Sequence, residues 1–131
     1  MAWRLYDYQN RRGENEIAAW TRGLQKKDRA RLNEKLDRLA EHGTGLLPKL
    51  LSGPIKGHRH IYELKINGSV ALRPLLCKGP EDMDGEFTIL YGAFERDNRF
   101  DPADAPDRAD DNREKLIAGT ARRCIHERVA D

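Results

Sequence analysis

The stretch that decides the predicted fold runs from Lys56 to Leu76, KGHRHIYELKINGSVALRPLL. It holds two short β-forming runs on either side of Asn67-Gly68. Asn-Gly is the strongest short-range signal for a β-hairpin, because both residues reach a positive φ at low cost. Apolar and charged residues alternate in the first run, as they do in a strand with one buried face. We therefore predict a hairpin with strands over 60–66 and 69–76.

Two cations of this hairpin are expected on its outward face. Successive side chains of a strand point to opposite sides, so Lys65 and Arg73 lie opposite the apolar residues of their strands. The stretch 49–73 carries five Lys or Arg residues and a single Glu. Such a basic platform attracts phosphate groups, although charge by itself favours the simpler interpretation of a solvated strand face.

The rest of the sequence predicts a strand and two helices before the hairpin, and a strand and a helix after it. The predicted elements are, in order, a strand over 3–8, a short helix ending near Gly23, a helix over 25–42 with a stripe of Leu32, Leu36 and Leu39, the two hairpin strands, a strand over 87–94 and a tail helix over 107–128. This order predicts an α+β fold in which the two N-terminal helices pack on one face of a small antiparallel sheet, followed by a C-terminal tail helix.

Composition suits one small and highly charged domain. The 131 residues are 38% apolar and 35% charged, with a formal net charge of +2. No apolar run reaches the length of a membrane span, and the first residues do not begin a signal peptide, so we expect a cytoplasmic protein without membrane contact. Cys77 and Cys124 are expected to be free thiols, because they lack the close spacing of a metal or redox pair.

Three short motifs follow one another along the chain: Tyr62-Glu63-Leu64-Lys65, then Leu72-Arg73, then Leu90 to Phe94 followed by Arg96. Their order and spacing resemble the RelE/ParE superfamily of bacterial toxins, within it the HigB-like, phage-related branch, which reads Y-E-L-R, Y-R and L-L-H-x-F-x-K-K at these places. The resemblance covers about residues 3–100. It implies a RelE-like toxin domain over 1–100 and a charged, partly helical extension over 101–131.

The resemblance also implies an activity. Family members that cut RNA are ribosome-dependent mRNA endonucleases, which work without metal or cofactor and are held inactive by a cognate antitoxin protein. In such an endoribonuclease a base removes the proton of a 2′-hydroxyl, and cations stabilise the charge that develops on the attacked phosphate. Carried over by position, the catalytic residues are Lys65, Arg73 and Arg96.

Further residues are expected to contact RNA. These residues are Lys56, Arg59, His58, His60 and Tyr91. His58 and His60 resemble half a metal site, but no further His, Cys or carboxylate stands at ligand spacing, so we predict no metal. Tyr91 is expected to share a face with Phe87 and Ile89 in the strand over 87–94.

Two alternatives to the endonuclease stay open. One is a toxin of the ParE kind that binds and poisons gyrase, and the other is a phage-derived binding protein that keeps the fold without activity. Asp97 stands where the family usually has a second lysine, and no tyrosine follows Arg96. These two departures favour the binding protein, whereas Lys65 and Arg73 favour the endonuclease.

Overall fold

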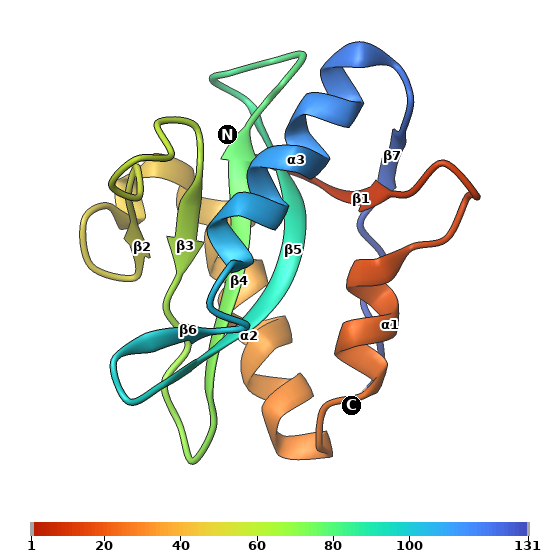
Figure 1. Ribbon diagram of the computed structural model, residues 1–131. Helices are drawn as coiled ribbons and strands as arrows, with labels where there is room; N and C mark the ends of the chain where they lie inside the picture. Colours follow the sequence, from red (N-terminus) through yellow and green to blue (C-terminus); the bar gives the residue numbers. More distant parts are fainter. Residues whose placement is uncertain (1, 131) are drawn as a thin grey trace.

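A mixed β-sheet with helices on both faces forms the fold (Figure 1). The computed structural model describes residues 2–130, and in this range the sheet has seven strands in the order β2-β3-β4-β5-β1-β7, with β6 paired to β5 outside this order. The strands are β1 (Arg4–Gln9), β2 (Leu51–Ser52), β3 (Tyr62–Leu64), β4 (Ala71–Lys78), β5 (Glu86–Arg96), β6 (Arg99–Asp101) and β7 (Arg122–Ile125). The helices are α1 (Glu16–Arg22), α2 (Lys26–His42), the 3-10 helix η1 (Gly43–Leu46) and α3 (Ala105–Ala118).

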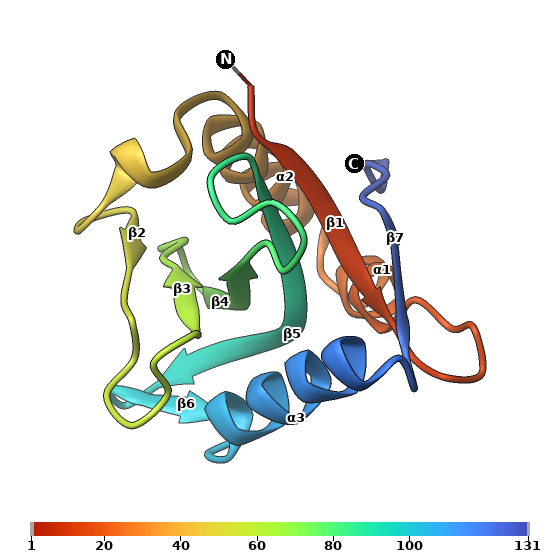
Figure 2. The same cartoon turned by 90° about the horizontal axis from the view of Figure 1, so that it is seen from above.

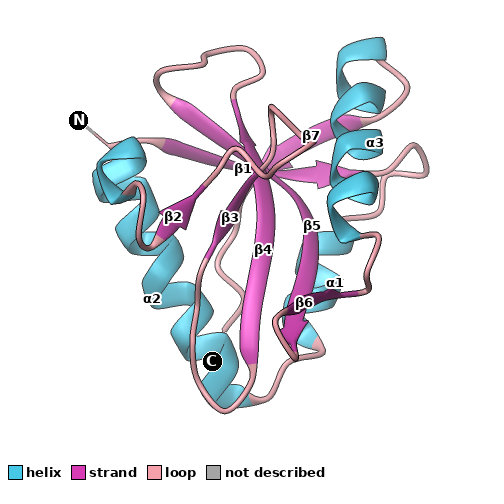
Figure 3. Cartoon of the chain, turned by 60° about the vertical axis from the view of Figure 1, so that its left-hand side comes forward, coloured by secondary structure: helices cyan, strands magenta, loops and turns pink. Residues whose placement is uncertain are grey.

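The helices divide between the two faces of the sheet (Figures 2 and 3). α1 and α2 share a core with one face, in which Leu36 of α2 and Leu72 of β4 are buried together. α3 shares a second core with the opposite face, in which Ala109 and Leu75 are buried. The predicted RelE-like α+β fold, with its helices on one face of a small antiparallel sheet, is therefore wrong. Because α3 buries small alanines rather than large apolar residues, its sequence carries only a weak helical stripe.

The sheet is mixed because β1 runs parallel to β5. Leu5 lies opposite Phe87, and Asp7 lies opposite Ile89. The other pairs, including β4 with β5 and β7 with β1, are antiparallel. Alternation of side chains shows which face of a strand is buried, but it carries no information about the direction of the neighbouring strand. The prediction of a wholly antiparallel sheet is therefore wrong for the pairing of β1 with β5.

The predicted tail helix over 107–128 ends early, and a strand follows it. α3 stops before Gly119, whose φ of 78° is left-handed, and the amide of Thr120 donates to the carbonyl of Lys115 at 3.0 Å. β7 then pairs with β1, with Ile125 opposite Tyr6. The last thirty or so residues thus contribute a helix to one core and a strand to the sheet.

The connection between β3 and β4 is not the two-residue turn that Asn67-Gly68 predicts. Neither residue has a positive φ, and the pairing resumes only between Ile66 and Leu72. Tertiary contacts hold this longer loop, because Asn67 accepts a hydrogen bond from Arg73 at 3.0 Å. The two-residue turn occurs instead at Asp97-Asn98 between β5 and β6, where both residues have positive φ, 53° and 61°.

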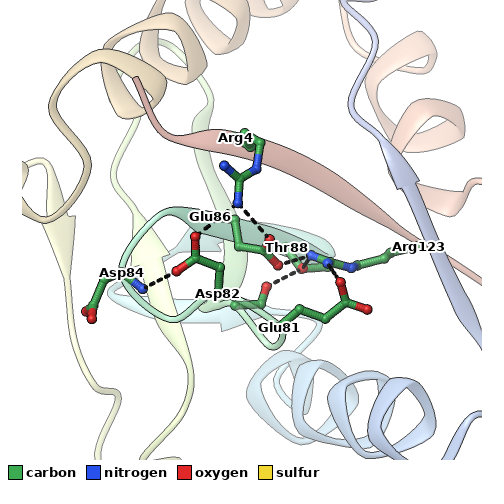
Figure 4. Close-up of polar contacts among 8 residues, drawn as sticks. Arg4, Glu81, Asp82, Asp84, Glu86, Thr88 and Arg123 are labelled. Carbon is green, nitrogen blue, oxygen red and sulfur yellow. Dashed lines mark hydrogen bonds and ion pairs between the residues drawn. The ribbon is translucent and has the colours of Figure 1, made fainter. Parts of the chain in front are cut away.

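A charge network attaches β7 to the strands beside it (Figure 4). Glu86 of β5 is 2% exposed and accepts hydrogen bonds from Arg123 of β7 and from Arg4 of β1. Arg123 also lies 2.8 Å from Glu81, and its guanidinium carbon is 4.0 Å from the centre of the Tyr6 ring. Since a buried carboxylate is costly unless it is paired, Arg123 compensates Glu86 only while β7 is in place.

Candidate functional site

Arg73, the first predicted catalytic cation, is buried in β4. Its side chain is 5% exposed and donates to the carbonyl of Leu72 at 2.8 Å and to Asn67 at 3.0 Å. A guanidinium nitrogen also lies 3.4 Å from a carboxylate oxygen of Glu95. These contacts hold the β3–β4 loop and β5 together, so the position of Arg73 is that of a structural residue.

Lys65 lies in the same cluster of charges as Arg73. Its side chain is 40% exposed, and its amine is 3.8 Å from Glu63. Burial raises the pKa of Glu63 above its ordinary value, and Glu95 adds to this effect, while Lys65 and Arg73 oppose it. The structure therefore brings the two predicted cations together, but it also sets a carboxylate beside each of them.

Arg96 is separate from this cluster. Its side chain forms an ion pair with Asp101 at 2.7 Å and lies over the ring of Phe94, at 5.9 Å from the ring centre. Phe94 packs against the core of α1 and α2, whereas Glu95, the partner of Arg73, alternates to the other face of β5. The three predicted catalytic residues consequently do not converge on one point.

Three of the predicted RNA contacts, His58, Arg59 and His60, line a cavity of about 510 Å³ beside α3. His58 shares a hydrogen bond at Nδ1 with Asp110 of α3, and its Nε2 lies 3.5 Å from Asp107. Arg59 donates to Nε2 of His60 at 3.2 Å. Burial, and then the nearby Arg113 and Arg59, lower the pKa of His60, so this ring is neutral near pH 7. Lys56 is exposed on the same loop.

A larger cavity, of about 700 Å³, lies on the other side of α3. We call it the α3 cleft, and it is lined by the β1–α1 turn, by one side of α3 from Arg108 to Lys115 and by Tyr91 of β5. Among its lining residues are four cations and two tyrosines: Arg11, Arg12, Arg108, Lys115, Tyr8 and Tyr91. Only Tyr91 among these was expected to contact RNA.

The β1–α1 turn holds one wall of the α3 cleft. The side-chain oxygen of Asn10 accepts from the amides of Arg12 and Glu14, both at 3.0 Å. Gly13 closes the turn with a left-handed φ of 81°. This turn leaves the side chain of Arg11 exposed at the mouth of the cleft.

α3 forms the opposite wall. Arg108 and Lys115 are seven residues apart, which places both on one side of the helix. Asn112, between them, is 8% exposed and donates to the carbonyl of Leu90 at 2.8 Å, which fastens α3 to β5. The cations of α3 are thereby held at a set distance from the sheet.

A bulge in β5 turns Tyr91 into the α3 cleft. Leu76 pairs with Ile89 and Leu75 pairs with Tyr91, so Leu90 is an extra residue in β5. Tyr91 therefore lies on the α3 face, opposite the face on which strict alternation with Ile89 predicted it. The guanidinium of Arg108 lies over the Tyr91 ring, with its carbon 5.7 Å from the ring centre, and we call this pair the Arg108–Tyr91 platform.

The charges of the α3 cleft are only partly compensated. Arg12 pairs with Glu14 at 2.9 Å, and Arg108 pairs with Asp104 at 3.0 Å. Arg11 and Lys115 have no carboxylate partner among the residues that the structure describes. These two unpaired cations come from opposite walls, so a negatively charged ligand in the cleft can contact both.

Sequence reasoning missed this site except for Tyr91. The pair Arg11-Arg12 before Gly13 was visible as a basic turn, and Arg108 and Lys115 show helical spacing. Their convergence depends on α3 packing against β5 and on the bulge at Leu90. Neither feature has a clear local signal.

No family model, no curated protein and no solved structure matches this chain. Within residues 2–130, no group of three or more His, Cys, Asp or Glu side chains is placed to hold a metal ion. In the same range, no helix has both the length and the apolar character that crossing a bilayer requires.

Proposed function

We propose that this chain binds single-stranded RNA in the α3 cleft. The observation that carries the proposal is the convergence of four cations and the Arg108–Tyr91 platform on one cavity. Phosphates require cations, and unpaired bases stack on aromatic rings and on guanidinium planes. RNA rather than DNA is chosen because the motifs resemble toxins that act on mRNA.

Different residues of the cleft would contact the phosphates and the bases of the RNA. Arg11 and Lys115, which lack carboxylate partners among the described residues, are placed to contact phosphates from opposite walls. Arg108 is an exposed residue, and a base can stack on its guanidinium. Glu16 and Asp111 also line the cleft, so its cations exceed its carboxylates by only two, and the salt dependence of binding should correspond to a few neutralised phosphates.

The test is fluorescence anisotropy with a short 5′-labelled oligouridylate. Arg11→Ala combined with Lys115→Ala should weaken binding at least about tenfold. The slope of the logarithm of the binding constant against the logarithm of the salt concentration should become shallower by about 0.7 for each phosphate that the variant no longer neutralises. Arg108→Ala should weaken binding because a base can no longer stack on its guanidinium, with less change in this slope.

Lys26→Ala combined with Lys27→Ala is the matched control, because it also removes two exposed cations, from α2 on the opposite face of the sheet. If the variant of Arg11 and Lys115 binds as tightly as this control, the α3 cleft is not the RNA site.

RNA cleavage is a second candidate function, and one observation favours it. The neutral His60 carries a lone pair at Nε2 beside Arg59. A phosphate that engaged Arg59 would free this lone pair to take the proton of a 2′-hydroxyl. The 2′-oxygen then attacks the phosphorus and forms a cyclic phosphate, while the 5′-oxygen leaves and takes a proton from water. Under this second candidate function, the chain would be a toxin that cleaves mRNA on the ribosome and is held inactive by a cognate antitoxin.

Inducible expression with mapping of RNA 5′ ends tests cleavage. His60→Ala and Lys65→Ala should each reduce growth arrest and the number of new RNA ends if their side chains act in cleavage. Growth arrest without new RNA ends would favour gyrase as the target. RNA binding in vitro with no arrest and no new ends would leave the chain as a binding protein.

A further inference from the structure

β7 is an edge strand with one free side. Its four residues pair with β1, from Tyr6 opposite Ile125 to Gln9 opposite Arg122. In Figure 2 the ribbon of β7 lies at the border of the sheet, and no other strand lies beyond it. A strand in this position presents a row of backbone donors and acceptors to the outside.

The ladder identifies which backbone groups point outward. The amide of His126 donates to the carbonyl of Leu5 at 3.0 Å, so the backbone of His126 faces β1. In an antiparallel pair, alternate residues bond to the neighbouring strand, and the residues between them face away. The amides and carbonyls of Arg123 and Ile125 therefore point outward, and they have no backbone partner within residues 2–130.

An apolar side chain stands on this free edge. Ile125 is 72% exposed, and it borders a cavity of about 520 Å³ whose lining includes Ala18 and Val129. A long apolar side chain on an open strand is a site of uncontrolled association unless something covers it. An extended segment pairing with β7 would cover Ile125 and could place a side chain in this cavity.

The charges around the edge determine the kind of partner. Arg22, which lines the cavity, and Arg122, at the start of β7, are exposed and have no carboxylate partner among the described residues. Arg128 also lines the cavity but pairs with Asp37 at 2.8 Å. Glu127 is the carboxylate among these lining residues. A second copy of the chain would bring a second set of these arginines to the same edge, where the like charges repel one another. An acidic segment is complementary.

We propose that the outer edge of β7 binds an acidic, extended segment of a partner protein as an added strand. The added strand hydrogen-bonds to Arg123 and Ile125 through their backbones, and its carboxylates lie near Arg22 and Arg122. This surface is distinct from the α3 cleft, and it does not depend on RNA binding.

The test is an NMR titration of the full ¹⁵N-labelled chain with a peptide of alternating Glu and Val. We expect saturable shifts that are largest at the amides of Arg123 and Ile125, and slower hydrogen exchange of both amides. A peptide of alternating Lys and Val should bind at least about tenfold more weakly, because its charge matches that of the edge.

Two variants of Ile125 distinguish binding through backbone hydrogen bonds from binding through the side chain alone. Ile125→Pro removes an outward N–H and leaves the hydrogen bond between His126 and Leu5, so it should abolish peptide binding while the amide of His126 stays protected. Ile125→Ala keeps the N–H and should retain the pattern of shifts with weaker binding.

Three outcomes would overturn the proposal. One is the absence of shifts at Arg123 and Ile125 with the Glu-Val peptide, and another is equal binding of the two peptides. The third is a concentration-dependent dimer of the chain that protects the same two amides, which would make a second copy the occupant of the edge.

Discussion

At the scale of single residues, Arg73 shows how a charge can be misread from sequence. Its position on the outward face of a strand predicted a catalytic cation, yet its guanidinium is buried against Asn67 and Glu95. The outward face of β4 is covered because α3 packs on it. A loss of activity in an Arg73 variant would therefore report on folding as well as on chemistry.

Arg73→Ala should lower the free energy of unfolding by about 1–3 kcal/mol, because it removes the packing and the polar contacts of a side chain that is only 5% exposed. Lys65→Ala is the comparison, since the Lys65 side chain is 40% exposed and its amine lies as far as 3.8 Å from Glu63, so this ion pair should contribute less than the contacts of Arg73. Urea unfolding followed by circular dichroism measures both. Equal stability of the two variants would contradict the structural role of Arg73.

Glu63 predicts a pH dependence of stability. Burial raises the pKa of Glu63 above its ordinary value of 4.5. A carboxyl group with a raised pKa binds more protons in the folded than in the unfolded state, so the free energy of unfolding falls as pH rises through the range just above 4.5. Glu63→Gln should remove this part of the fall, which urea unfolding at several pH values measures. An unchanged slope would argue that Glu63 is not desolvated.

At the scale of elements, the β5–β6 turn is open to a direct test. Asp97 and Asn98 both have positive φ, as a type I′ turn requires, and glycine is the preferred residue at the second position. Asn98→Gly should raise the free energy of unfolding by about 0.5–1 kcal/mol, and Asn98→Val should lower it by about 1–2 kcal/mol. Thermal unfolding distinguishes the two, and the same shift in both variants would contradict this turn geometry.

At the scale of the whole molecule, α3 is part of the core and β7 is part of the sheet. The face of the sheet beneath α3 carries Ile61, Leu75 and Leu90, which are at most 1% exposed. Removal of residues 101–131 would uncover this face and would leave Glu86 without its partner Arg123.

A chain of residues 1–100 should therefore fail to fold, with loss of dispersed NMR signals and increased binding of a hydrophobic dye. A chain of residues 1–126 is the control, because it keeps α3, β7 and the hydrogen bond of His126 to Leu5. If residues 1–100 retained a cooperative unfolding transition, α3 and β7 would be an addition to an independent domain.

Elements with a strong local signal could be predicted from the sequence. The stripe of Leu32, Leu36 and Leu39 predicted a helix over 25–42, and α2 spans Lys26–His42 with all three buried. β4 and β5 lie where alternating apolar residues predicted strands, with ends shifted by two residues or fewer. Such patterns indicate which face of a helix or strand is buried. They can be read from sequence because they depend only on residues that are close together in the chain.

Only the tertiary structure decided how these elements meet. The parallel pairing of β1 with β5, the strand β7 and the packing of α3 on the second face join residues far apart in the chain. The bulge at Leu90 then turned Tyr91 toward Arg108 and created the candidate site. The hydrophobic effect that drives this packing has no direction, so it decides that a face is buried but not which segment buries it.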